Sequence, residues 1–434
     1  MVKKIFALFL SIITVLSLCS CESASPVSED TGKVPVILNV ITSYGSEDGN
    51  RRNFEYAVAA YENSTGNKVK DGSDTSNEEW KAKVLTDFET GSEPDVLFFF
   101  TNADAEPFIK AGKVASLDEI RTVYPEYATN MKSSMLPLAS DGKCYAIPVM
   151  GYWENLFVNK AVLKACGISV PGKDYSWDQF LSDCEIIKSK GYTPIACSLA
   201  EVSHYWFEYA VLNNGSIDDH LNIPKLDENG NLVEDATAEK WIAALEDIKM
   251  LYELGYFPEN TLTARDAETV AMFGDGKAAF LLDGSWKVGY FSEYYADCLD
   301  DFTVCFVPSK GNRKTTEIIA GISAGYFITR KAWDDPLKRE AAVEFVSQLT
   351  SNEVIKKFVT TEITALKEEI VPQGLNSLQQ SAAEIRNSTT AIVGAVQDTI
   401  SNEARSSLFA NIQNVVTGNM SSHDAVEIAM RLNK

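Results

Sequence analysis

Apolar residues recur along this chain with two different periods. Residues 34–42 (VPVILNVIT) and 96–100 (VLFFF) are short, continuous apolar runs, typical of strands that are buried on both faces. Between them, residues 52–62 and 78–88 place apolar side chains three and four positions apart, which predicts amphipathic helices. Strands that alternate with helices indicate a parallel sheet with helices packed on both faces.

The same alternation continues through the rest of the chain, and we find no internal repeat. The polar run DENGN at residues 227–231 predicts a hairpin turn between two short extended pieces. The further strands are predicted at residues 146–149, 156–158, 302–307 and 324–328, and the further helices at 177–189, 238–254, 340–349 and 421–432.

The N-terminus has the pattern of an export signal. Lys3 and Lys4 precede an apolar run at residues 5–18, which is shorter than the ~20 residues that a membrane-spanning helix needs. The run ends in Leu-Cys-Ser-Cys, which resembles a bacterial lipobox with Cys21 as the lipid-carrying residue. We therefore predict a lipoprotein signal peptide at residues 1–20 and a polar tether at residues 21–33.

Composition narrows the remaining possibilities. About 400 residues are more than one hydrophobic core usually supports, so two lobes are expected. The net charge of −22 argues against binding to nucleic acid or to anionic membrane surfaces. The six cysteines after the lipobox show no CxxC spacing, so no metal site or redox motif is predicted. They are either buried thiols or disulfides.

A series of short motifs occurs in one order along residues 35–360. They are PDV (94–96), AGKVASL (111–117), YAIP (145–148), LFVNK (156–160), SWDQF (176–180), FGDGKAAF (273–280), DGSW (283–286), VP (307–308), AGISAG (320–325) and AAVEF (341–345). Together they resemble the extracellular solute-binding proteins of ATP-driven sugar importers, the relatives of maltose-binding protein. One departure is Val158, where the family usually has Tyr.

The resemblance implies an α/β, two-lobed periplasmic-binding-protein-like fold of type II. Each lobe would be a mostly parallel sheet with flanking helices, and a hinge would join the lobes. Lobe 1 would comprise residues 34–150 and 308–360, and lobe 2 residues 151–307 and 361–434. The chain would be a lipid-anchored, extracytoplasmic monomer that captures a sugar and passes it to the permease subunits of an ATP-binding-cassette (ABC) importer. It would need no cofactor and catalyse no reaction.

Sugar rings have apolar faces and many hydroxyl groups, so a sugar site needs flat aromatic rings and planar polar side chains. Trp286 is the leading candidate for a stacking platform, since it follows a strand end and a glycine. The other expected ligand-binding residues are Tyr44, Asn102, Tyr152, Trp153, Glu154, Asn155, Trp206, Asp283 and Gly321.

Two alternatives remain open. Residues 321–325 (GISAG) match the G-x-S-x-G motif of serine hydrolases, although the residues after Ser323 are strand-like and the chain has only three histidines. In the other alternative, the same fold binds a polyamine or a peptide, because Glu154 and Asp283 would also suit a cation.

Overall fold

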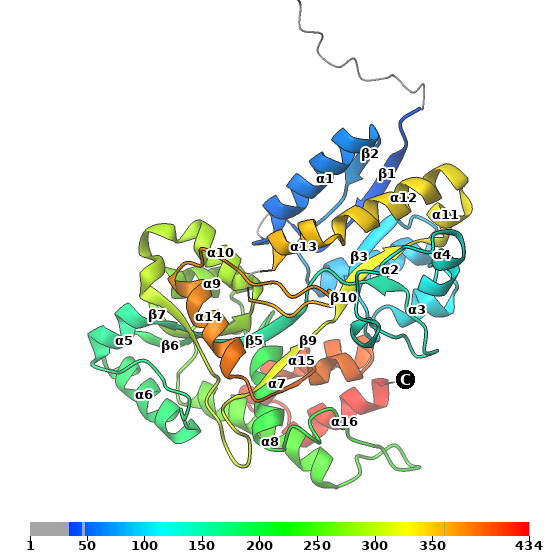
Figure 1. Cartoon of the computed structure of the whole chain (residues 1–434). Helices are drawn as coiled ribbons and strands as arrows, with labels where there is room; N and C mark the ends of the chain where they lie inside the picture. The colour runs from blue at the N-terminus through cyan, green and yellow to red at the C-terminus, as the bar shows by residue number, and fades with distance from the viewer. Residues whose placement is uncertain (1–33, 46–47, 360, 434) are drawn as a thin grey trace, which may run out of the picture. The chain divides into compact units, whose positions relative to one another are not determined.

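The computed structural model describes residues 34–45, 48–359 and 361–433 (Figure 1). The predicted signal peptide at residues 1–20, Cys21 and the tether at residues 21–33 lie outside the described residues. The described residues from Val36 onward form one compact unit, and within it two sheets each have their own hydrophobic core.

The first sheet has five strands in the order β2-β1-β3-β10-β4. Strand β1 pairs in parallel with β2 and β3, whereas β10 runs antiparallel to β3 and β4. The strands are β1 (Ile37–Ile41), β2 (Lys68–Asp71), β3 (Val96–Phe100), β4 (Ala146–Ile147) and β10 (Ala324–Ile328).

Helices cover both faces of this sheet, because successive side chains of a buried strand point to opposite faces. Phe98 of β3 packs into the core beneath α1 and α12, while its neighbour Phe99 packs against α2 and α3. The helices of this half are α1 (Arg51–Thr65), α2 (Glu78–Glu89), α3 (Glu106–Lys110), α4 (Leu117–Val123), α11 (Arg330–Asp334), α12 (Pro336–Leu349) and α13 (Asn352–Phe358).

The second sheet has six strands and is built around β5. Strand β5 runs antiparallel to β7 on one side and to β8 and β9 on the other, while β6 and β11 join in parallel at the edges. The strands are β5 (Tyr152–Asn159), β6 (Thr193–Ala196), β7 (Ala278–Gly284), β8 (Phe302–Cys305), β9 (Glu317–Gly321) and β11 (Ala391–Val393).

Two groups of helices cover the faces of the second sheet. Helices α6, α7, α8, α15 and α16 contribute to the larger core, and α9, α10 and α14 to the smaller one. The helices of this half are α5 (Lys160–Cys166), α6 (Trp177–Ser189), α7 (His204–Asn213), α8 (Ala236–Glu253), α9 (Asp266–Gly274), α10 (Trp286–Tyr294), α14 (Ser377–Ser388), α15 (Asn402–Val416) and α16 (Ser422–Leu432).

The α/β architecture with two sheets confirms the predicted fold class, but both sheets are mixed and not mostly parallel. Strand β5 enters the second sheet directly from β4 of the first, and its three neighbours β7, β8 and β9 all run antiparallel to it.

Local signals place the helix ends close to their predicted positions. Helix α6 begins at Trp177, as predicted, because the Ser176 hydroxyl accepts a hydrogen bond from the Gln179 N–H. Helix α2 begins after Asn77, whose side chain accepts from the Trp80 N–H in the same way. The predicted turn at residues 227–231 is also present, since Leu226 and Leu232 form an antiparallel bridge around it.

The chain passes between the two sheets where β4 leads into β5 and again where β9 leads into β10. These segments meet at Gly151, whose N–H donates to the Ile363 carbonyl at 2.7 Å. A Cβ on Gly151 would lie 2.4 Å from the Gly321 carbonyl oxygen and 2.5 Å from Cγ1 of Ile363. Three stretches that are distant in sequence therefore pack tightly against one another around Gly151.

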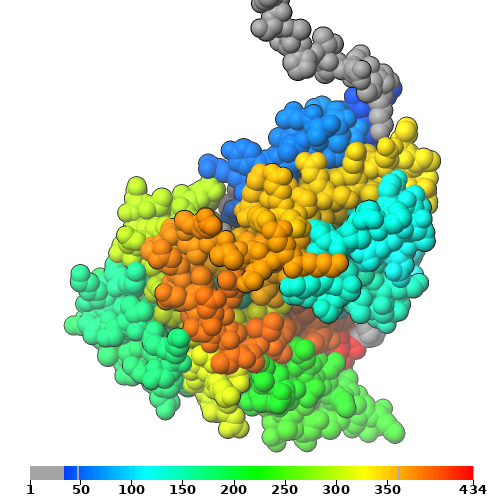
Figure 2. Space-filling view, in the orientation of Figure 1, coloured from blue at the N-terminus to red at the C-terminus, as the bar shows by residue number. Residues whose placement is uncertain are grey.

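On the face seen in Figure 2, the orange segment that contains α14 adjoins both the yellow α12 region and the green elements of the second sheet. The six cysteines of the described chain are all free, and five of them are buried. Among the described residues, none of the helices is both long enough and apolar enough to cross a membrane.

Candidate functional site

The predicted site residues of the second sheet gather at one edge, where the chain enters from the first sheet. Strand β5 starts there with Tyr152, and its antiparallel partner β7 ends there, with Glu154 opposite Gly284. Helix α10 begins immediately afterwards with Trp286. Antiparallel pairing thus brings residues 152–155 and 283–286 together, although they are far apart in sequence.

Alternation along β5 sends its first four side chains to opposite faces. Tyr152 packs on the larger core beside α7, and the carboxyl group of Glu154 approaches Glu208 of that helix. Trp153 turns into the smaller core, where it is 4% exposed and stacks on Phe157 with ring centroids 6.1 Å apart. Asn155 is fully buried, and neither of its side-chain polar atoms has a partner among the described residues.

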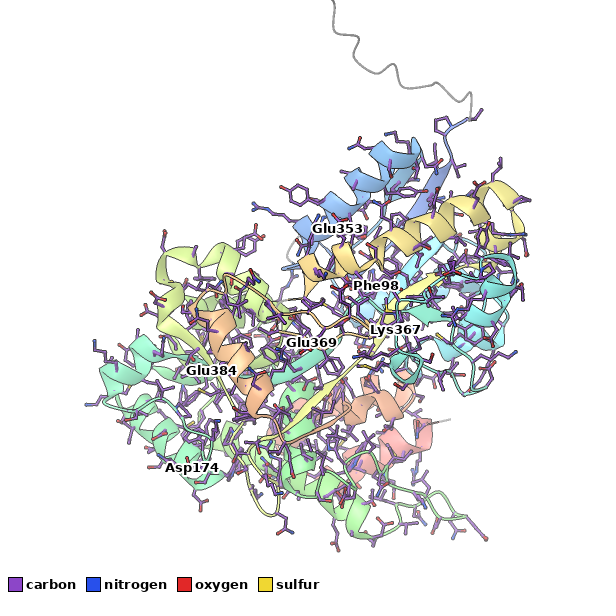
Figure 3. All side chains as sticks on the ribbon, viewed as in Figure 1. Phe98, Asp174, Glu353, Lys367, Glu369 and Glu384 are labelled. Carbon is purple, nitrogen blue, oxygen red and sulfur yellow. The ribbon has the colours of Figure 1, made fainter. Side chains whose placement is uncertain are left out.

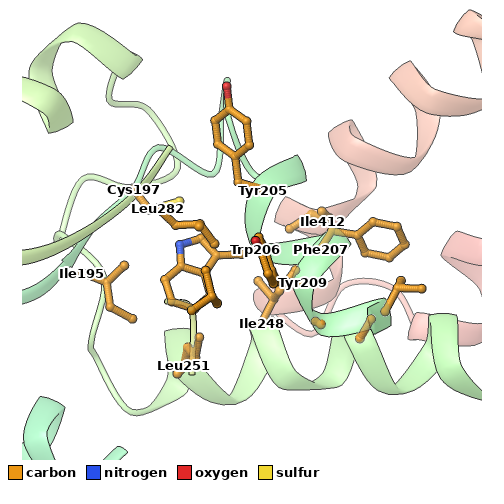
Figure 4. Close-up of a cluster of buried hydrophobic side chains, with 14 of the residues drawn as sticks. Ile195, Cys197, Tyr205, Trp206, Phe207, Tyr209, Ile248, Leu251, Leu282 and Ile412 are labelled. Carbon is orange, nitrogen blue, oxygen red and sulfur yellow. The ribbon is translucent and has the colours of Figure 1, made fainter. Parts of the chain in front are cut away.

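Trp206 is also a core residue. Its side chain is 3% exposed and stacks on Phe180 at 5.7 Å. Figure 4 shows the indole among Ile195, Leu251 and Leu282, whereas the neighbouring Tyr205 points in a different direction. The side chains of residues 205 and 206 therefore lie in different environments, even though both residues belong to α7.

An aromatic pair lies at the edge of the second sheet. The indole of Trp286 folds back over Gly284. The two are so close that a Cβ on this glycine would lie 2.0 Å from Cη2 of the ring. The rings of Trp286 and Tyr205 are 6.3 Å apart, and Trp286 keeps part of its surface exposed. Tyr152 accepts a hydrogen bond from the Ala395 N–H at 3.1 Å, and Gly321 lies against its ring.

Buried carboxyl groups accompany these rings. Glu154 and Glu208 are 2% and 0% exposed, and burial raises the pKa of both, since loss of water disfavours the charged form. Asp398 lies in the same region, and burial raises its pKa as well. Oε2 of Glu154 and both carboxyl oxygens of Glu208 accept no hydrogen bond from another group in the described part of the chain, apart from the contact between these two carboxyls.

Asp283 contacts residues of its own half of the protein. Its carboxylate accepts from the Gly284 N–H at 2.7 Å and lies 3.6 Å from Nζ of Lys287. Lys287 also pairs with Asp266 at 3.0 Å. Burial nevertheless raises the pKa of Asp283, with Lys287 acting in the opposite direction.

The first sheet contributes two of the predicted residues, and they are placed differently. Tyr44 is 2% exposed and stacks on Phe98 at 4.9 Å, and its hydroxyl has no partner in the described chain. Asn102 follows β3 and donates to Asp398 of the second half at 2.6 Å. Asn102 therefore lies where the two halves meet.

Two further contacts join the halves. Arg405 of α15 binds both oxygens of Asp104, at 2.7 and 2.9 Å, in the loop that follows β3. At the other side, Gly49 lies against Gly289 of α10 so closely that a Cβ on Gly49 would be 3.0 Å from its Cα. We call the aromatic pair, the buried carboxyl groups and the two polar residues that connect them to the first half the junction (Asn102, Tyr152, Glu154, Tyr205, Glu208, Asp283, Trp286, Asp398 and Arg405).

Sequence reasoning missed four junction residues: Tyr205, Glu208, Asp398 and Arg405. A signal for Glu208 was available, because it is the only acidic residue in the otherwise largely apolar segment HYWFEYAVLN of α7. A charged side chain inside a helix that is apolar on all sides must be buried with a partner or reserved for one. Asp398 and Arg405 carried no such signal, because their segments are ordinary amphipathic stretches.

Two surface pockets lie away from the junction. One, of about 300 Å³, is formed by residues 167–172, 174 and 175 with Gln179, Asp183 and Ile186. The other, of about 490 Å³, includes Asn159, Tyr192 and Tyr295. Figure 3 labels Asp174 of the first pocket in the second half and Phe98 in the first sheet, well apart from each other. Neither pocket includes a predicted site residue.

The GISAG segment does not have the local structure of a serine nucleophile. Ser323 lies between β9 and β10, and strand β10 follows it directly. A nucleophile elbow requires a helix after the serine. The GISAG segment is instead the connection between β9 and β10, where the chain passes from one sheet to the other.

Comparison with known proteins agrees with this architecture. The chain is 24% identical over 408 residues to a protein described as the maltooligosaccharide ABC transporter solute-binding lipoprotein of Streptococcus pneumoniae (strain ATCC BAA-255 / R6). That match covers 90% of this chain and 85% of the relative.

Solved structures show the same fold. A chitin oligosaccharide binding protein superposes with a TM-score of 0.77 at 19% identity, covering 92% of this chain and 98% of the other. The GacH receptor of Streptomyces glaucescens, solved without ligand and with acarbose, gives a TM-score of 0.72 at 17% identity over the same shares. The model of the family described as bacterial extracellular solute-binding protein matches residues 44–356. This match spans well over half of the chain, which therefore belongs to the bacterial extracellular solute-binding proteins.

Proposed function

We propose that this protein captures a neutral sugar or oligosaccharide at the junction and delivers it to an ABC importer. The observation that carries the proposal is the pairing of the Trp286 and Tyr205 rings, 6.3 Å apart, beside buried carboxyl groups that lack partners. Aromatic rings match the apolar faces of a sugar, and carboxyl groups match its hydroxyls. The maltooligosaccharide and chitin oligosaccharide proteins among its relatives support the same ligand class.

The two halves would act as lobes that close on the ligand. We assign residues 36–149 and 322–368 to the first lobe and residues 150–321 and 377–433 to the second, following sheet and core membership. This proposal places the boundary at residue 321 and not at 308, as expected from the sequence, since β9 pairs with β5. Gly151, Gly321 and Ile363 would form the hinge.

Of the predicted ligand contacts, we retain Asn102, Tyr152, Glu154, Asp283, Trp286 and Gly321. Trp153, Asn155 and Trp206 would instead support the site from within the cores, and Tyr44 from the core of the first lobe. The protein would leave its ligand chemically unchanged.

The N-terminal segment would tie the protein to the outer face of the cell membrane through a lipid on Cys21. The relative from Streptococcus pneumoniae is described as a lipoprotein, which supports this proposal. The permease subunits of the importer would be the protein partner of a monomeric receptor. Labelling with a radioactive fatty acid would test the anchor, with Cys21→Ala expected to abolish the label and Cys19→Ala to retain it.

Binding is tested by titration calorimetry with maltotriose, chitotriose, stachyose and spermidine. We expect one of the sugars to bind and spermidine not to bind. Trp286→Ala should weaken sugar binding by ~1–3 kcal/mol, a range taken by analogy from stacking on bases. The matched control is Tyr56→Ala, which removes an aromatic ring that is 68% exposed on α1 and should leave affinity unchanged. Binding of spermidine alone would instead support the polyamine alternative.

A further inference from the structure

Arg405 connects the two lobes from inside the protein. Its side chain is 1% exposed, and Nη2 binds both oxygens of Asp104, which is itself buried. Glu78 of α2 approaches the same nitrogen at 3.6 Å. Arg405 belongs to α15, which packs in the core of the second lobe, whereas Asp104 and Glu78 belong to the first lobe. This ion pair therefore exists only while the two lobes are in contact.

Only one of the three nitrogens of this guanidinium has a hydrogen-bond partner in the described chain. Nε and Nη1 are buried and have no hydrogen-bond partner among residues 34–45, 48–359 and 361–433. A guanidinium presents five N–H donors in a fixed fork, and each buried donor without an acceptor destabilises the protein, because it has lost its hydrogen bonds to water. An acceptor that is not part of this chain would remove this destabilisation.

Unused acceptors lie near these unused donors. Apart from the contact with Glu154, both carboxyl oxygens of Glu208 lack a partner in the described chain. Helix α7 packs against α15, since the rings of Phe207 and Phe409 lie 6.1 Å apart, and Arg405 is the cation whose charge acts on Glu208. The other neighbours of Glu208 are the acidic Glu154 and Asp398, and of these Glu154 alone is in contact with its carboxyl group. Donors and acceptors thus stand unpaired in one buried region, on α15 and α7.

Only some ligands satisfy both kinds of group. An ammonium ion donates but cannot accept, and a carboxylate accepts but cannot donate. A hydroxyl group does both, so adjacent sugar hydroxyls can accept from the guanidinium and donate to the carboxylate. This complementarity favours a neutral polyol over a cation, even though the region is rich in acidic residues.

We propose that Arg405 and Glu208 form a subsite for adjacent hydroxyls of the bound sugar, and that Asp104 positions Arg405 for this role when the lobes meet. The inference rests on the proposed sugar-binding function. Asp104 is then a positioning residue, since it acts through Arg405, whereas Glu208 and Arg405 touch the ligand. Occupancy and lobe contact are coupled because one guanidinium serves both.

The test uses the full-length protein, the sugar of the panel that binds most tightly, and the monodeoxy analogues of that sugar. In the wild type, at least one analogue should bind ~10–100-fold more weakly than the parent, because its missing hydroxyl leaves buried groups unpaired. In Glu208→Gln and Arg405→Gln, the parent sugar should bind ~10-fold or more weakly. The penalty for that particular analogue should shrink to ~3-fold or less, since the groups it left unpaired are gone.

Asp104→Asn separates positioning from contact. It should weaken the parent and all analogues by a similar factor and leave the deoxy penalty in place. The matched control is Arg431→Gln, which removes an arginine of α16 whose side chain is 50% exposed and paired with Glu427. This variant should change neither affinity nor the deoxy penalty.

The outcomes are distinguishable. If the wild type binds none of the sugars, the proposed function fails and this inference fails with it. If a sugar binds but Glu208→Gln keeps the full deoxy penalty for every analogue, the subsite is absent and the proposed function still stands. Thermal unfolding checks that each variant folds, and Glu208→Gln decides the question alone if Arg405→Gln does not fold.

Discussion

The core around Trp206 and the junction around Glu208 occupy opposite faces of one helix, α7. Both are closed to solvent, with Trp206 at 3% and Glu208 at 0% exposure. The neighbours of Trp206 are apolar or aromatic, and the only polar group of this side chain, the indole N–H, has no hydrogen-bond partner in the described chain. Around Glu208 the neighbours are carboxyls and a guanidinium with several unpaired atoms.

The difference shows that burial alone does not identify the role of a residue. A well-packed apolar core stabilises the fold by removing surface from water. A buried region of unpaired polar groups destabilises it, and such regions persist where a ligand completes the missing hydrogen bonds. Trp206 thus belongs to the part of α7 that maintains the structure, whereas Glu208 belongs to the part that we propose binds the ligand.

The largest effect we predict is on the core side of this comparison. Trp206→Ala should lower the free energy of unfolding by ~3–5 kcal/mol, because it leaves a large cavity among Phe180, Phe257 and Leu251. Sugar affinity measured well below the lowered melting temperature should change by less than ~3-fold. A loss of affinity with unchanged stability would instead make Trp206 a ligand contact.

A smaller effect is expected from the protonation of the junction. The pKa of Glu154 is raised from 4.5 to about 8, chiefly by burial, with Asp398 and Asp283 acting in the same direction. Glu208 contacts the same carboxyl group and shares this environment. The folded protein therefore holds a proton that the unfolded chain releases above pH 4.5, so stability is full below that pH and is lost as the pH rises through 8.

Glu154→Gln should flatten this dependence, since glutamine does not titrate. We expect the slope of the free energy of unfolding between roughly pH 5 and pH 8 to fall by up to ~1 kcal/mol per pH unit. Calorimetric melting temperatures across this range, compared with those of Glu55→Gln, measure the effect. Glu55 is an exposed control on α1, and an equal slope in the wild type and in Glu154→Gln would mean that Glu154 is ionised in the folded state.

The smallest effect sets the baseline. Lys356 and Glu368 form an ion pair in which both side chains are more than 40% exposed. Exposed pairs of this kind contribute less than ~1 kcal/mol, because water already solvates both charges. Lys356→Ala should shift stability by less than ~1 kcal/mol and leave sugar affinity unchanged, whereas Arg405→Gln changes both. Urea unfolding of the two variants side by side gives the contrast.

Much of the fold followed from hydrophobic periodicity. The apolar runs at residues 96–100 and 324–328 predict β3 and β10, and the spacing of apolar residues predicts α1 and α6, because these signals are local. Strand direction was harder to predict from the sequence, because the antiparallel pairing of β5 depends on the path of the chain between the sheets. The short strands β9 and β11 are set by their partners more than by their own sequences.

The site was predictable only in part, because the direction of a side chain depends on the register of its element. Tyr152 and Trp153 are equally aromatic and adjacent, yet the pleat of β5 sends one to the junction and the other into the core. Arg405 could not be identified, since its partner Asp104 lies about 300 residues away in sequence and the two meet only across the lobes.

The most direct test of this account is to replace Glu208 by methionine, which has a similar volume and no charge. If the unpaired carboxyl group is retained for the ligand, Glu208→Met should raise the free energy of unfolding of the sugar-free protein by ~1–3 kcal/mol. The same variant should lose most of its sugar affinity in titration calorimetry. A protein that becomes less stable while binding sugar as tightly as the wild type would contradict the account.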